Sequence, residues 1–190
     1  RETVIEYRTP VGSVRTTEVL TDEMLDAGAS VSWVSECAVK TAADFDTLAY
    51  LFSHSRVEPR AGYTKRQSAV GESGAAVAYI IGTACPIHHI MKELMPVEQF
   101  FYAMHDHPEK IEMLAEAMEP YYSEMKRLAA DTEAEIVMLG ANYDDSITYP
   151  RFFERYILPP LRDYAELLHA RGKLLMTHTD GENRRLMSLY

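Results

Sequence analysis

The sequence contains few cysteines and few basic residues, and each shortage narrows the class of protein. Only Cys37 and Cys85 occur, and neither belongs to a CxxC pair, so the chain offers no disulfide framework and no thiolate zinc knuckle. The 19 basic residues are outnumbered by 29 acidic ones, which gives a net charge of -10. Such a chain repels a phosphate backbone. We therefore expect no nucleic-acid partner and a reducing, cytoplasmic setting.

Long hydrophobic runs and secretion signals are also missing. The longest apolar run, Ala75–Cys85, is much shorter than the roughly 20 residues that span a bilayer. The chain begins at Arg1, and no charged, apolar and small-residue signal pattern follows. We therefore expect no membrane partner. With 190 residues and 47% hydrophobic content, the chain is long enough to bury one sizeable core.

The N-terminal residues predict a hairpin followed by a helix. Residues 3–19 mix β-branched and polar side chains around a turn at Pro10–Ser13, which is typical of two short strands. Further on, Thr41 or Ala42 opens a segment whose apolar residues recur at helical spacing. We expect a surface helix there.

Three apolar runs follow, separated by helical segments. Val77–Thr83 is a continuous apolar run of the kind expected for a parallel strand buried on both faces. Glu135–Gly140 and Lys173–Thr177 predict the second and third strands. The helical segment after the first run is expected to break at Asp106–Glu109, where Pro108 suits a first helical position.

The segment from Pro150 to Ala170 predicts another helix, which Pro159 and Pro160 interrupt. A proline inside a helix removes a hydrogen bond and clashes with the preceding turn, so we expect a kink near Arg155–Pro160. Gly172 is well placed as the residue just past the helix end.

Alternating strands and helices predict parallel βα units. Neither GxGxxG nor GxxxxGK[ST] occurs, which disfavours a doubly wound, nucleotide-binding sheet. We therefore predict an α/β fold, a (β/α)8 TIM barrel, within one domain over residues 1–190. The hairpin and helix would occupy 1–60 and the successive βα units 75–190. Such barrels usually need about 250 residues, so only part of the barrel is expected in this chain.

Polar side chains follow the predicted strands, at the edge where barrel active sites form. Asp144 and Asp145 are candidate catalytic groups, because adjacent carboxylates raise one another's pKa. His178 is a third, because it directly follows a buried run, and with Asp180 it can bind a metal or move a proton. The candidate substrate-binding residues are Asn142, Tyr143, Thr83, Cys85 and His88.

Each candidate also has a plainer interpretation. Backbone groups can satisfy a neutral His178, and Asp180 can belong to a turn that caps the next helix. One of the two adjacent aspartates can be a structural carboxylate at a helix entry. Cys85 can be a small apolar packing residue, and His88 can lie at a solvated helix start. The sequence leaves these alternatives open.

Three segments together resemble the uroporphyrinogen decarboxylase family. VAYIIGTACPIHHIMKELM (77–95) resembles the family's VPLIGFAGAPWTL-type segment, and FFYAMHDHPEKIEMLAEAMEPYYSEMKRLA (100–129) its next helical segment. EIVMLGANYDDSITYPRFFERYILPPLRDYAELLHARGKLLMTHTDG (135–181) is similar to its strand, its S-P-x-x-F-like helix and its following strand. The resemblance covers most of the chain from about residue 77 onward.

The resemblance implies a TIM barrel and one of two activities. The first is decarboxylation of uroporphyrinogen acetate groups without a cofactor. The second is zinc-dependent methyl transfer that involves a corrinoid and a thiol such as coenzyme M. The family's zinc methyltransferases carry His-x-Cys where this chain has His178 and Asp180. The resemblance thus implies zinc at His178 and Asp180, with a carboxylate in place of the soft thiolate.

The N-terminal hairpin is more like the methyltransferase side of the family. We therefore expect a corrinoid-linked methyltransferase-like enzyme, with a small-molecule substrate and a corrinoid protein as partner. Decarboxylation of a tetrapyrrole is the alternative, and a non-catalytic barrel domain that binds a partner is the next. Exposed strand edges favour association, so a homo-oligomer is also expected.

Overall fold

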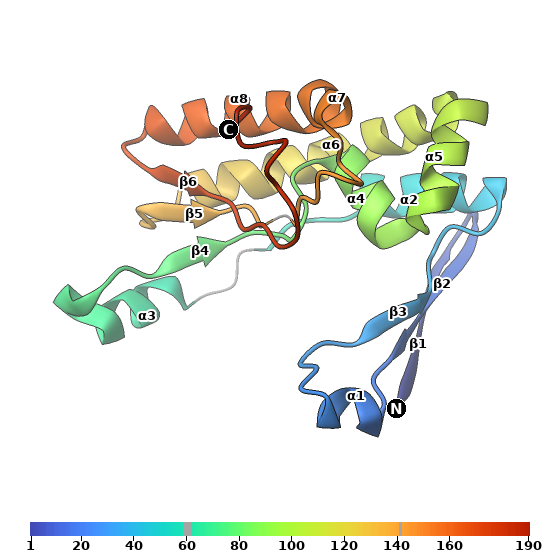
Figure 1. Cartoon of the computed structure of the whole chain (residues 1–190), viewed down its shortest axis with the longest axis horizontal. Coiled ribbons are helices and arrows are strands. Elements are labelled where there is room, and N and C mark those ends of the chain that lie inside the picture. The colour runs from blue at the N-terminus through green and yellow to red at the C-terminus, as the bar shows by residue number, and fades with distance from the viewer. Residues whose placement is uncertain (59–61, 141) are drawn as a thin grey trace. The chain divides into compact units, whose positions relative to one another are not determined.

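A computed structural model of the chain describes residues 1–58, 62–140 and 142–190. These residues form two compact units. The first unit comprises Arg1–His54 and Ile90–Met118, and the second comprises Ser55–His89 and Glu119–Tyr190. Helix α6 (Pro108–Ala130) contributes residues to both, and Figure 1 shows the order of the elements along the chain.

The first unit contains an antiparallel sheet. Strand β1 (Glu2–Thr9) pairs with β2 (Gly12–Val19), which confirms the predicted hairpin, and β3 (Trp33–Glu36) pairs with the other edge of β2. A Cβ atom at Gly12 would lie 2.6 Å from Oγ1 of Thr47, so a glycine at the turn lets a helix approach the hairpin.

The helices of the first unit begin and end at local signals. They are α1 (Asp22–Asp26), α2 (Ala42–Ser53), the π-helical turn η2 (Ile90–Leu94) and α5 (Val97–Asp106). Thr41 caps α2 as predicted, and its backbone amide donates to Asp44 Oδ2 at 2.6 Å. The predicted break is confirmed, because α5 ends at Asp106 and α6 begins at Pro108. The buried apolar side chains of these helices include Phe45, Leu48, Phe100, Ile111, Leu114 and Met118.

The second unit contains a parallel sheet. Strands β4 (Val77–Tyr79), β5 (Ile136–Met138) and β6 (Leu174–Met176) lie side by side in that order, and both pairs are parallel, as the sequence predicts. The other elements of this unit are α3 (Tyr63–Val70), the short 3-10 helix η1 (Gly71–Ser73), α4 (Pro86–His89), α7 (Pro150–Phe152), the π-helical turn η3 (Phe153–Ile157) and α8 (Leu158–His169).

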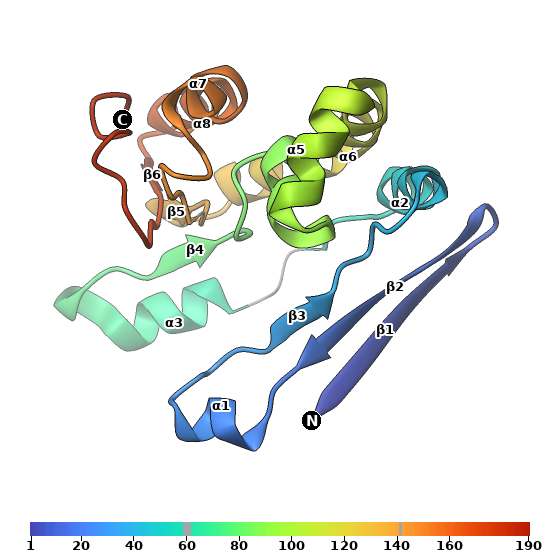
Figure 2. The same ribbon diagram turned by 45° about the vertical axis from the view of Figure 1, so that its right-hand side comes forward.

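Only one face of the parallel sheet is well covered. Val137 at its centre is fully buried, and α8 packs along β6, beside which it lies in both Figure 1 and Figure 2. On the outer strands Tyr79 and Leu174 are 62% and 59% exposed. The prediction that the first strand is buried on both faces, over Val77–Thr83, was therefore wrong.

The predicted partial (β/α)8 barrel was also wrong. The described residues form two separate three-stranded sheets, one antiparallel and one parallel, and neither closes on itself. Alternating apolar runs and helices predict that neighbouring strands pair in parallel. Closure of a barrel depends on the number of strands and on the stagger between them, and no local sequence pattern indicates either. The boundary predicted at residue 60 lies outside the described residues.

The long helical segment of the second unit is interrupted where proline predicts it. A π-helical turn, η3, separates α7 from α8, and it ends just before Pro159 and Pro160, which lack the amide protons that a regular helix uses. Gly172 has a φ of +68°, and the amide of Lys173 donates to the Leu168 carbonyl at 2.9 Å. The predicted interruption before the two prolines and the glycine stop are confirmed, and the predicted kink stays a prediction.

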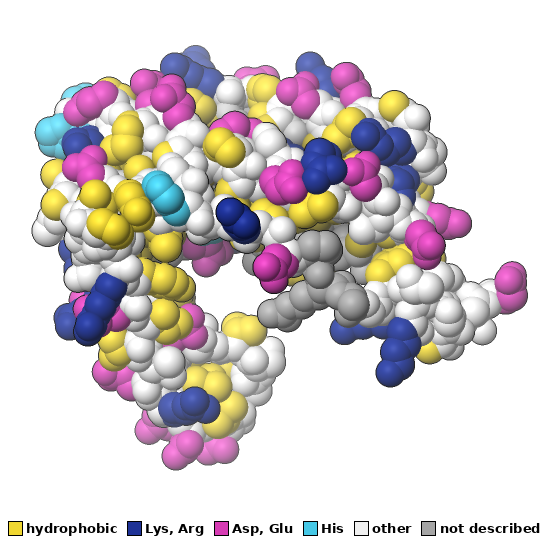
Figure 3. All heavy atoms as spheres, turned by 180° about the vertical axis from the view of Figure 1, so that it is seen from behind, with side chains coloured by type: hydrophobic (Ala, Val, Ile, Leu, Met, Phe, Trp, Pro, Cys, Tyr) yellow, Lys and Arg dark blue, Asp and Glu magenta, His cyan; other side chains and the backbone are white. Residues whose placement is uncertain are grey.

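Within the described residues, every helix is too short or too polar to cross a bilayer. Figure 3 shows acidic, basic and apolar side chains interspersed on the face that it presents.

Candidate functional site

An open pocket of about 150 Å³ lies at the carboxyl ends of the three parallel strands. This is the edge at which the sequence places the candidate groups, because the ends of neighbouring parallel strands meet there. The described residues that line the pocket come from all three strands or from the loops that follow them. They are Tyr79, Gly82, Met138, Gly140, Asn142 and His178.

Two glycines allow the ring of Tyr79 to form one wall of this pocket. A Cβ atom at Gly140 would lie 3.0 Å from Tyr79 Cε2, and one at Gly82 would lie 3.3 Å from the Tyr79 hydroxyl. Larger residues at these positions would push the ring aside. Tyr79, Gly82, Met138 and Gly140 were not predicted from the sequence, although a glycine near the end of the first two apolar runs was the available signal.

His178 and Asn142 meet as predicted, across the ends of β5 and β6. The His178 Nδ1 atom lies 3.0 Å from the Asn142 Oδ1 atom. When Asn142 presents this oxygen, Nδ1 is the donor of the bond, and in the neutral imidazole Nε2 then keeps its lone pair. Asp180 Oδ1 lies 3.7 Å from that Nε2 atom. An imidazole and a carboxylate therefore share one small region of surface.

Asp144 and Asp145 are engaged by backbone and hydroxyl groups. Asp144 Oδ1 accepts hydrogen bonds from the hydroxyl and the amide of Ser146, the latter at 2.9 Å. These bonds, that of the hydroxyl first, lower the pKa of Asp144 below its ordinary value. Asp145 is buried, and its Oδ2 accepts from the Arg185 amide at 2.8 Å. Neither carboxylate lines the pocket.

A buried hydrogen-bonded chain joins Thr83, Tyr122 and His89. The Thr83 hydroxyl, which is buried, bonds to the Tyr122 hydroxyl, and the latter lies 2.9 Å from His89 Nδ1. Burial lowers the pKa of His89 to about 4, so this imidazole is neutral at physiological pH. The chain fixes the loop after β4 to helix α6. Thr83 thus serves packing and does not line the pocket.

The remaining predicted substrate-binding residues are buried and do not line the pocket. The rings of His88 and Tyr143 stack with centroids 5.4 Å apart, and His88 Nδ1 accepts from the Ala84 amide at 3.2 Å. Burial raises the pKa of the Cys85 thiol to about 11, and its Sγ donates to the Tyr156 carbonyl at 3.3 Å. Cys85 is therefore protonated and is a poor nucleophile.

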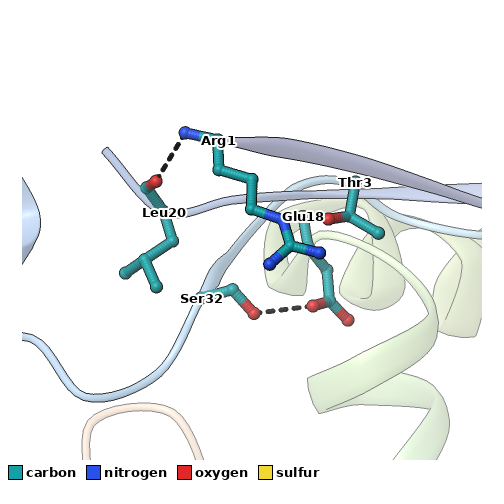
Figure 4. Close-up of a pocket in the computed structure, with 5 residues that line it drawn as sticks. All are labelled: Arg1, Thr3, Glu18, Leu20 and Ser32. Carbon is teal, nitrogen blue, oxygen red and sulfur yellow. Dashed lines mark hydrogen bonds between the residues drawn. The ribbon is translucent and has the colours of Figure 1, made fainter. Parts of the chain in front are cut away.

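A second pocket, of about 210 Å³, belongs to the first unit. Figure 4 shows the side chain of Arg1 extending toward Glu18, and Ser32 Oγ donates to Glu18 Oε2 at 2.6 Å. The terminal ammonium group donates to the Leu20 carbonyl at 2.7 Å. These groups bond to one another, and none of the candidate residues is among them.

No group of three His, Cys, Asp or Glu side chains in the described part of the chain is arranged to hold a metal ion. His178 and Asp180 form a pair only. No family model, no curated protein and no solved structure matches the chain.

Proposed function

We propose that this chain is an enzyme similar to the methyltransferase branch of the uroporphyrinogen decarboxylase family, and that it methylates a small thiol beside His178. The observation that carries the proposal is the hydrogen bond between His178 Nδ1 and Asn142 Oδ1. A histidine that ligates a metal usually donates its other ring N–H to an oxygen in this way, which fixes the tautomer and the ring orientation.

His178 and Asp180 supply donor atoms that fit zinc. Imidazole nitrogen and carboxylate oxygen are both common zinc ligands, and the two atoms face each other at 3.7 Å. A catalytic site generally takes three protein ligands, and the described residues supply this pair of them. Bound zinc would act as a Lewis acid that makes a thiol more acidic.

The residues of the chain would orient the reacting thiol. Asn142 holds the imidazole, and the side chains of Tyr79 and Met138 offer an apolar wall to the methyl group. The thiolate sulfur would form the new S–C bond while the bond from the methyl carbon to the donor breaks, and the electron pair would leave with the donor. The thiol proton would pass to solvent past Asp180, which is exposed. A corrinoid partner protein as donor rests on the sequence resemblance.

The size and the lining of the pocket favour methyl transfer over decarboxylation of a tetrapyrrole. Sites for drug-sized ligands usually measure about 300–1,000 Å³, and this pocket measures about 150 Å³. No lysine or arginine is among the described residues that line it, so the described lining offers no permanently charged cation to the carboxylates of a uroporphyrinogen. Both cysteines are free thiols, which fits the cytoplasmic setting that we propose.

Zinc binding tests this proposal most directly. We expect about one zinc ion per chain, lost in His178→Ala and bound at least about tenfold more weakly in Asp180→Ala. His169→Ala is the matched control, because it removes another exposed histidine of the second unit. The measurements are elemental analysis and competition with a zinc indicator, followed by methyl transfer from methylcobalamin to coenzyme M. Wild-type protein that neither binds zinc nor transfers the methyl group would contradict the proposal.

A further inference from the structure

The segment that follows the proposed site has no regular secondary structure, yet it is firmly attached. Residues 181–185 lie just after Asp180, between β6 and the chain end. The Asp145 amide donates to the Glu182 carbonyl at 2.8 Å, and the Arg185 amide donates to Asp145 Oδ2 at the same distance. One residue therefore bonds to both ends of a short stretch of backbone.

The burial of Asp145 strengthens the second of these bonds, which its carboxylate accepts from the Arg185 amide. Asp145 is 4% exposed, and a buried carboxylate is stable only when hydrogen-bond donors replace its water. A backbone amide that donates to an ionised oxygen forms a charge-assisted bond, which is about twice as strong as a neutral one. Removal of the carboxylate would release the Arg185 amide.

Asp144 contacts the same segment at Gly181. A Cβ atom at Gly181 would lie 2.6 Å from Asp144 Oδ2, and Gly181 has a φ of +86°. Glycine is thus required there by its backbone conformation and also by the closeness of this carboxylate. The other oxygen of Asp144 is bonded to Ser146, so the side chain has a fixed direction.

We propose that Asp144 and Asp145 form a clasp that positions His178 and Asp180, and that they are positioning residues and not reacting groups. The clasp holds residues 181–185 against the loop that also carries Asn142. The backbone between this anchor and β6 is short, so its path fixes the distance from His178 Nε2 to Asp180 Oδ1. The clasp itself does not depend on the proposed function. Only its consequence for zinc binding and methyl transfer rests on that proposal.

The test uses the metal-free protein, in a buffer with a chelator, and measures the imidazole of His178. Histidine-selective ¹⁵N NMR, with His178→Ala for assignment, should show mainly the Nδ1–H tautomer in the wild type. In Asp145→Ala we expect a mixture of tautomers and roughly tenfold faster amide exchange over residues 178–186. Asp145→Asn keeps an acceptor oxygen and should restore most of both signals. Asp163→Ala, an exposed aspartate on α8, is the control and should change neither.

A pair of glycine variants isolates the contact with Asp144. Gly172 and Gly181 both have positive φ, but a Cβ atom at Gly172 meets nothing within 4 Å. Both alanine variants add backbone strain, and only Gly181→Ala also displaces Asp144. We expect Gly181→Ala to alter the His178 spectrum and Gly172→Ala to leave it unchanged.

The outcomes separate the clasp from the methyltransferase proposal. If the wild type binds no zinc, the proposed function fails, while the tautomer and exchange measurements still decide on the clasp. If Asp145→Ala folds and keeps the wild-type His178 spectrum, the clasp is refuted. If Asp145→Ala does not fold, Gly181→Ala decides, and a wild-type His178 spectrum in that variant would refute the clasp.

Discussion

At the scale of single residues, folding strongly lowers the pKa of the His89 imidazole. Burial lowers its pKa from the ordinary value of 6.5 to about 4. Between these two values the unfolded chain binds a proton that the folded chain does not bind. The free energy of unfolding must therefore fall as the pH falls through this window, and the contribution of His89 levels off on either side.

This linkage gives a prediction about acid stability. The contribution of His89 should fall by up to about 3 kcal/mol between about pH 7 and about pH 4. His89→Asn retains a polar group near Tyr122 and lacks the titration, so its stability should depend less on pH. Urea denaturation at several pH values measures this, with His105→Asn as the exposed control. An identical pH slope in wild type and His89→Asn would contradict the assignment.

The site residues differ in how far sequence predicts them. His178 and Asn142 come together because each directly follows a strand, and the neighbouring strands are parallel, so strand order alone brings them close. The position of Tyr79 in the wall of the pocket could not be predicted in the same way. Its ring reaches the pocket because Gly82 and Gly140 leave space for it, and the closeness of Gly140, which is distant in sequence, is visible only in three dimensions.

At the scale of the elements, Tyr122 on helix α6 links this helix to the loop after β4. The Tyr122 hydroxyl bonds to both Thr83 and His89. Tyr122→Phe would leave these buried polar groups with one partner fewer, and such a loss typically costs about 1–3 kcal/mol.

A double-mutant cycle tests this link. Tyr122→Phe and Thr83→Val should each destabilise the protein, and the double variant should lose less than the sum, because both changes remove the same bond. Tyr102→Phe, on the exposed face of α5, should change stability by less than about 0.5 kcal/mol. Chemical denaturation followed by circular dichroism gives the change in the free energy of unfolding for all four variants. Strict additivity would show that Thr83 and Tyr122 act independently.

The sequence predicts the helices better than the strands, for a physical reason. Helix boundaries depend on local chemistry, as at Thr41, Pro108 and Gly172, and all three signals act as expected. Strand length depends on pairing with distant residues. The apolar run from residue 77 to 83 therefore gives only a three-residue strand, since β5 supplies partners for no more.

At the scale of the whole molecule, the sequence correctly predicts that β4, β5 and β6 pair in parallel, but it wrongly predicts that they belong to a closed barrel. The order β4-β5-β6 follows from the alternation of apolar runs and helices. The antiparallel sheet of the first unit has its own pairing, and nothing in the described residues joins the two sheets into a barrel. The resemblance to a barrel family led to the wrong fold class because similar local segments are compatible with more than one global arrangement.

The parallel sheet also leaves apolar strand surface exposed in the described part of the chain. β4 and β6 each pair only with β5, and Leu174 and Met176 on β6 are 59% and 40% exposed. Parallel strands are usually covered on both faces, and unpaired edges with apolar side chains favour association. We therefore predict reversible self-association that rises with protein concentration.

Leu174→Lys tests this prediction, because a lysine on an edge strand opposes edge-to-edge contact. The variant should shift the monomer–oligomer equilibrium toward monomer by about tenfold or more in sedimentation velocity, since burial of a leucine contributes about 1.5–3 kcal/mol. Val31→Lys adds the same charge at an exposed apolar residue of the first unit that lies outside any strand, and it should leave the equilibrium unchanged. If both variants associate less, the added positive charge is responsible, and β6 is not the contact surface. If the wild type is monomeric at every concentration, its exposed strands do not drive association.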